Sequence, residues 1–154
     1  MKKGQGAFEY IMVVGIAMIL IVPGAVLFFN YSKRSADETL RAQIDMVGKD
    51  IVEGVEKVYY IGENSWETVK VDVPDNVNWI YVLDDYELVI VYDTQVGLSE
   101  AVFYSDIPMT TPYLPIDGKY YINDITDPTV KSHAGLRIIR ITSRGTFVVI
   151  NETT

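Results

Sequence analysis

The feature that most constrains this chain is an uncharged, apolar run near its start. Residues 10–32 carry no charge, and residues 10–29 read YIMVVGIAMILIVPGAVLFF. At about 1.5 Å per helical residue, such a run spans a hydrocarbon core of roughly 30 Å. A cleaved secretory peptide has a shorter apolar region, of about 7–15 residues, followed by a small-residue cleavage site. The run predicts a helix that crosses a membrane and stays in the mature chain.

The rest of the chain is acidic. The 154 residues carry 13 Lys+Arg against 21 Asp+Glu, a formal charge of −8, yet their mean hydropathy is +0.14. A positive mean hydropathy in an acidic chain indicates that a strongly apolar segment is joined to an acidic domain of ordinary size. The charge argues against a nucleic-acid partner. The absence of cysteine excludes disulfide scaffolds, thiolate zinc sites and cysteine nucleophiles.

Pro23-Gly24 interrupts the apolar run. Proline removes a backbone donor, so the pair predicts either a tolerated kink or a flexible point at which the helix can leave the bilayer and repack. Basic residues stand on both sides of the run, and they leave its orientation undecided.

The junction before the run is more specific. It reads MKKGQGAFEY, which places Glu9 at the edge of the apolar segment. An ionised carboxylate in lipid or among packed helices is costly, so it needs a partner there. The alternative is that Glu9 is an ordinary charge at the headgroup boundary.

This junction resembles the class III signal peptide of archaeal type IV pilins. In that family, Gln-x-Ser-x-Glu-x-x-x-Leu follows a short basic leader that ends in glycine. The corresponding residues here are Lys2, Lys3 and Gly4 in the leader, then Gln5, Ala7 in place of Ser, Glu9, and Val13 in place of Leu. The resemblance implies that a membrane-embedded prepilin peptidase cuts between Gly4 and Gln5.

The resemblance also implies an extracellular filament. The precursor waits in the cell membrane, and a cytoplasmic assembly ATPase and a membrane platform protein help it polymerise into a helical homopolymer with roles in adhesion. The subunits would pack through residues of the N-terminal helix, which are Gln5, Glu9, Val13, Pro23 and Gly24. We expect Glu9 of one subunit to pair with the Gln5 ammonium of another and to set the register, as one polar group does in a coiled coil.

A helical stripe follows the apolar run. Leu40, Ile44, Val47, Ile51, Val55 and Val58 recur at steps of three or four, which predicts an amphipathic continuation of the same helix to about Lys57. The domain plan is therefore a leader (1–4), an apolar transmembrane or filament-core helix (5–31), its amphipathic continuation (32–61) and a β-rich head (62–154).

Period-two patterns fill the head. The predicted strands are 68–73, 79–83, 87–92, 101–104, 119–122, 136–142 and 146–151. They predict an α+β fold in which a long N-terminal helix packs on an antiparallel sheet, as in type IV pilins. Residues 107–129 contain four prolines and are predicted to be a surface loop around the strand 119–122. Tyrosines near it either cover the sheet or form a contact patch: Tyr104, Tyr113, Tyr120 and Tyr121.

The sequence offers no enzyme site or cofactor motif. His133 is the only histidine, and no phosphate-binding loop occurs. Asn123, Asp124 and Asp127, or Asp84-Asp85, lack the ligand spacing of a calcium loop, so we predict solvated turns and no metal. Two glycosylation sequons begin at Asn30 and Asn151, and Asn151 is the better acceptor because Asn30 lies beside the membrane or the filament core.

Two alternatives remain. The chain is either a membrane-anchored extracellular domain that binds a partner without polymerising, or a minor pilin or tip adhesin. The junction discriminates between a subunit and an anchor, because an anchor needs neither the Gly4–Gln5 cut nor Glu9.

Overall fold

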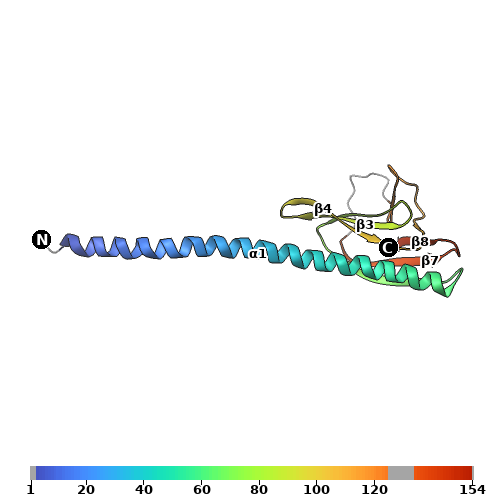
Figure 1. Cartoon of the computed structure of the whole chain (residues 1–154), viewed down its shortest axis with the longest axis horizontal. Helices are drawn as coiled ribbons and strands as arrows, with labels where there is room; N and C mark the ends of the chain where they lie inside the picture. The colour runs from blue at the N-terminus through green and yellow to red at the C-terminus, as the bar shows by residue number, and fades with distance from the viewer. Residues whose placement is uncertain (1–2, 125–133, 154) are drawn as a thin grey trace. The chain divides into compact units, whose positions relative to one another are not determined.

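One long helix precedes a β-rich head. The computed structural model describes residues 3–124 and 134–153, with side chains from Phe8 onward. Helix α1 (Lys3–Ile61) is continuous through Pro23, and all the strands follow it in the chain (Figure 1). The chain forms two compact units, Met1–Glu38 and Thr39–Thr154, so α1 contributes to both. The predicted α+β fold is confirmed.

The C-terminal end of α1 is capped by the residues that follow it, Gly62 and Ser65. Gly62 has a φ of +119° and its N–H donates to the carbonyl of Tyr59 at 3.1 Å, which is the favoured glycine ending of a helix. The Ser65 hydroxyl lies 2.6 Å from the carbonyls of both Val58 and Gly62. The helix ends at Ile61, one turn beyond Lys57 and at the boundary that the domain plan places between helix and head.

The head contains two sheets where the sequence predicted one. Its strands are β1 (Trp66–Val73), β2 (Val77–Leu83), β3 (Glu87–Thr94), β4 (Gly97–Tyr104), β5 (Met109–Thr110), β6 (Lys119–Tyr121), β7 (Gly135–Ser143) and β8 (Val148–Thr153). The first sheet has the order β1-β7-β8-β5 and the second β4-β3-β2-β6. All pairings are antiparallel except the parallel pair of β5 and β8.

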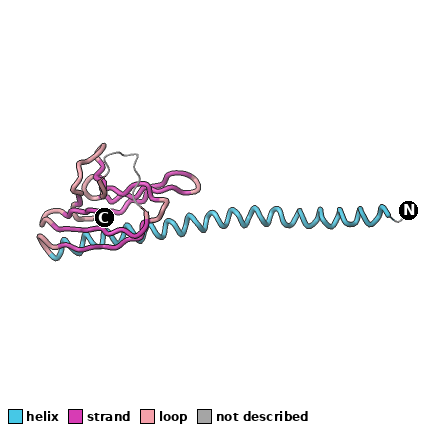
Figure 2. Tube along the Cα trace, turned by 180° about the vertical axis from the view of Figure 1, so that it is seen from behind, coloured by secondary structure: helices cyan, strands magenta, loops and turns pink. Residues whose placement is uncertain are grey.

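The predicted helical stripe forms the centre of the head's core. From Ile44 to Val58 its apolar side chains are at most 5% exposed, and they cluster with residues of both sheets. Strands run alongside this part of α1 (Figure 2), and the Gly54 backbone comes so close that a Cβ there would stand 2.7 Å from Ile141 of β7. Removing this much apolar surface from water holds the helix on the sheets.

The prediction of a surface loop over 107–129 is wrong in its first part. Ile107 and Met109 are buried, and Met109 begins strand β5. Pro108 lacks an N–H, but its carbonyl accepts a hydrogen bond from Val148 at 2.8 Å, so the proline fits beside a strand. Residues 125–133, which include Asp127 and His133, lie outside the described residues.

The second sheet is covered on both faces. Its inner face joins the main core, whereas its outer face carries a separate apolar cluster. That cluster contains Tyr81, Val89, Val91 and Tyr121, with Trp79, Leu83 and Ile116 packed against it. Strands β2 and β3 read as nearly continuous apolar runs because both of their faces are buried.

Candidate functional site

The first unit consists of a helix whose described apolar side chains are exposed. From Phe8 to Ala36 every side chain is exposed, and the large apolar ones range from 38% for Val14 to 73% for Tyr31. The helix is long and apolar enough to cross a membrane, judged by length and composition. Because exposed apolar surface costs roughly 25 cal/mol per Å², this surface needs lipid or other protein around it.

The junction residues lie at the start of this helix. Lys3, Gly4 and Gln5 form the beginning of α1, and Lys2 lies outside the described residues. Gln5, Glu9 and Val13 follow each other at intervals of four, so the helix places them along one side. The side chains of Glu9 and Val13 are exposed.

Pro23 and Gly24 lie inside the helix without breaking it. Both are exposed, and a Cβ added at Gly24 would meet nothing within 4 Å. Proline removes one backbone hydrogen bond here, so this position is the weakest point of the apolar segment.

The two sequon asparagines occupy different settings. Asn30 is exposed on α1 beside the apolar segment, whereas Asn151 is half-buried in β8. The Asn151 side-chain oxygen accepts a hydrogen bond from the Tyr113 hydroxyl at 3.1 Å. Modification of either residue stays a prediction.

Candidate metal ligands do not gather in the part of the chain that the structure describes, where no three His, Asp or Glu side chains form a group suited to an ion. Asp84 and Asp85 form the β2–β3 turn, and both have positive φ values. Asn123 is buried and Asp124 is exposed. Asp84 and Asp85 fit the predicted turn, whereas the burial of Asn123 does not fit a solvated turn.

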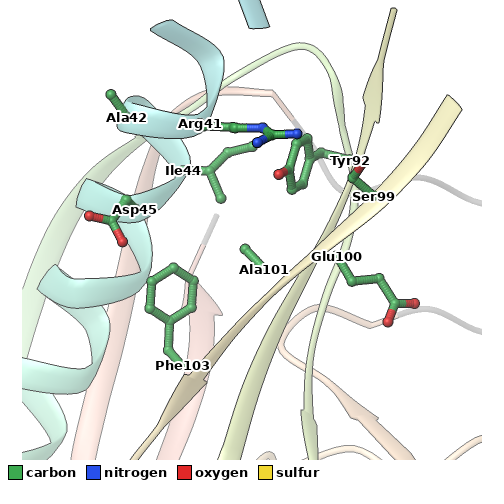
Figure 3. Close-up of a pocket in the computed structure, with 9 residues that line it drawn as sticks. All are labelled: Arg41, Ala42, Ile44, Asp45, Tyr92, Ser99, Glu100, Ala101 and Phe103. Atoms are coloured by element: carbon green, nitrogen blue, oxygen red, sulfur yellow. The ribbon is translucent and has the colours of Figure 1, made fainter. Parts of the chain in front are cut away.

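A cavity that the sequence did not predict lies within the head, beside α1. It has a volume of about 630 Å³ and opens between helix residues 41–45 and strands β3 and β4. Figure 3 shows Ile44, Tyr92 and Phe103 around this space, with Arg41 reaching across it from the helix. The apolar stripe predicted burial at Ile44 but carried no signal for incomplete packing next to it.

A second cavity, of about 320 Å³, lies on the outer face of the second sheet. Tyr81 and Tyr121 are cross-strand partners with ring centroids 5.6 Å apart, and Lys119 Nζ lies 4.8 Å from the centroid of Tyr81. Burial raises the pKa of the Tyr81 hydroxyl, and the Glu100 carboxylate raises it further. The alternation of Trp79 with Tyr81 was the available sequence signal, because residues two apart share one face of a strand.

In comparisons with known proteins, no family model, no curated protein and no solved structure matched this chain.

Proposed function

We propose that this chain is a structural subunit of an extracellular filament of the archaeal type IV pilus kind. It would be made as a membrane precursor and cut between Gly4 and Gln5. The observation that carries the proposal is the division of α1: one stretch forms the core of the head, and the other exposes apolar side chains along its whole described length. The leader motif supports the view that this exposed stretch leaves the membrane after processing and packs against the same stretch of other subunits.

The exposed helix suits assembly as well as membrane residence. Helices that are apolar all round can pack together and exclude water, and contacts between different faces of successive copies generate a helical filament. Removal of the leader takes away two lysines and changes the formal charge from −8 to −10. Acidic heads around an apolar core would keep such a filament soluble.

The partners follow from this proposal. The precursor would meet a prepilin peptidase in the membrane, then an assembly ATPase and a membrane platform protein, and finally other copies of itself. Adhesion to surfaces or to other cells would be the role of the filament.

N-terminal sequencing of filaments sheared from cells tests the proposal. We expect mature chains that begin at Gln5. A Gly4→Leu variant should stay uncut in the membrane, because it presents a branched side chain where the motif has glycine. Gly6→Ala is the matched control, since the motif leaves that position free. Intact chains found only in membranes, with none in the sheared fraction, would instead favour a permanently anchored extracellular domain, for which the length of the apolar helix also suffices.

A further inference from the structure

The outer face of the second sheet holds a small aromatic pocket. Its volume is about 320 Å³, at the lower end of the range for small-molecule sites. Its apolar wall consists of Trp79, Tyr81, Val91, Leu98, Ile116 and Tyr121. The register explains this gathering: Trp79 pairs with Val91, which pairs in turn with Glu100, and Tyr81 pairs with Tyr121.

One polar atom in this wall has no partner. Trp79 Nε1 is buried and makes no hydrogen bond to any residue that the structure describes. A buried indole N–H usually finds an acceptor, and leaving one unpaired costs about 1–3 kcal/mol. Because this N–H is itself buried, a ligand oxygen in the pocket would reach it only after a shift of the indole ring.

The charged residues that line the pocket limit the net charge that a ligand can carry. The carboxylates of Glu100 and Asp117 and the ammonium of Lys119 also line it. An anion would face two carboxylates, and a cation would compete with Lys119 for the face of the Tyr81 ring. A neutral ligand with many hydroxyls avoids both conflicts, because each hydroxyl donates to a carboxylate or accepts from an N–H.

We propose that this outer pocket binds a neutral pyranose sugar. A pyranose has an apolar face of C–H groups, which would pack on Trp79 and Leu98. Its hydroxyls would donate to Glu100 and Asp117 and accept from the Lys119 ammonium. This proposal does not rest on polymerisation, because the pocket belongs entirely to the head.

Tryptophan fluorescence tests the pocket directly. The chain has two tryptophans, and Trp66 is exposed in the first sheet, where it stacks with Arg140. A Trp66→Phe variant leaves Trp79 as the only tryptophan, so excitation selective for indole reports on this residue alone. The full chain should be kept in a polyoxyethylene detergent, because alkyl glycoside headgroups are themselves sugars. We expect glucose, galactose, mannose or N-acetylglucosamine to change the Trp79 emission saturably in the millimolar range.

A matched pair of variants locates the binding. In the Trp66→Phe background, Glu100→Ala removes a carboxylate from the pocket and should weaken binding about tenfold. Glu87→Ala makes the same change on the neighbouring strand, opposite Tyr104 and outside the pocket, and should leave the affinity unchanged.

Three outcomes would overturn the proposal: no saturable response to any of the four sugars, equal weakening by both variants, or saturable binding of choline or glucuronate in place of a neutral sugar. None of them bears on filament formation, which the sequencing experiment tests separately.

Discussion

Two glycines of α1 set how closely the helix approaches the strands. A Cβ at Gly54 would stand 2.7 Å from Ile141 and 2.9 Å from Val69, and a Cβ at Gly48 would stand 2.2 Å from the ring of Phe103. Glycine inside a helix normally costs roughly 1 kcal/mol relative to alanine. Its presence here is explained by the space it leaves. Phe103 is partly exposed and can move aside, whereas Ile141 is fully buried and cannot.

We therefore expect Gly54→Ala to destabilise the head. Overpacking costs about 1–3 kcal/mol and outweighs the gain in helix propensity of roughly 1 kcal/mol, for a net loss near 1 kcal/mol. This corresponds to a melting temperature lower by roughly 3 °C, measured by near-ultraviolet circular dichroism of the full chain in detergent.

The control for this prediction is Gly15→Ala. It makes the same change in the same helix, where a Cβ meets nothing within 4 Å. Its melting temperature should not fall. A Gly54→Ala protein as stable as the parent would show that the head repacks around the added methyl group.

At the scale of elements, periodicity predicted most of the fold. The steps of three and four at 40–58 located the packed part of α1. Six of the seven predicted strands match observed strands to within two residues at each end, because alternation shows which face of a strand is buried. The seventh, predicted at 101–104, is the second half of β4, whose first half exposes Leu98. Alternation shows which face of a strand is buried but not which strands pair with one another, so the sequence predicted one sheet where the structure has two. Strand β5 was missed because its two residues are too few to show a pattern and lie among prolines.

Between Lys3 and Ala36, helix α1 carries a single acid, Glu9. In a bundle of apolar helices an unpaired carboxylate would cost several kcal/mol. In the proposed filament, the cut after Gly4 would create a Gln5 ammonium at the positive end of a neighbouring helix, and this ammonium would be a suitable partner. The pair would align neighbouring helices to within one register, because any axial shift separates the two charges.

We expect Glu9→Leu to be processed normally yet to yield at least about tenfold less filament, because the loss of one partner leaves the ammonium buried and unpaired. The measurement compares subunit in the sheared fraction with subunit in membranes by immunoblot. Glu38→Leu is the control, since it makes the same substitution on an exposed position beyond the apolar stretch. Normal filament yield from Glu9→Leu would remove this residue from the assembly mechanism.

At the scale of the whole molecule, the exposed apolar helix and the outer pocket differ in how far each could be predicted from the sequence. The residues of the exposed apolar helix are contiguous in the chain, and the stretch from Phe8 to Tyr31 contains all of its described large apolar side chains. The outer pocket draws on β2, β3, β4 and β6 and on the loop before β6. Its members come together only through strand order and register, and a single sequence specifies neither.

The division of the chain into two units yields a prediction about the head alone. The Thr39–Thr154 unit contains all of the described main core, and Ser35-Ala36-Asp37-Glu38 has the spacing of a capping box with acids in the first turn, so a helix can begin there. A chain beginning at Ser35 should therefore be a soluble monomer by light scattering and unfold cooperatively, with a melting temperature within a few degrees of the full chain. The full chain without detergent is the control and should aggregate, because residues 10–29 remain exposed. An aggregated or unfolded head would mean that the apolar helix is needed to complete the fold, and that the surface assigned here to assembly also serves the head.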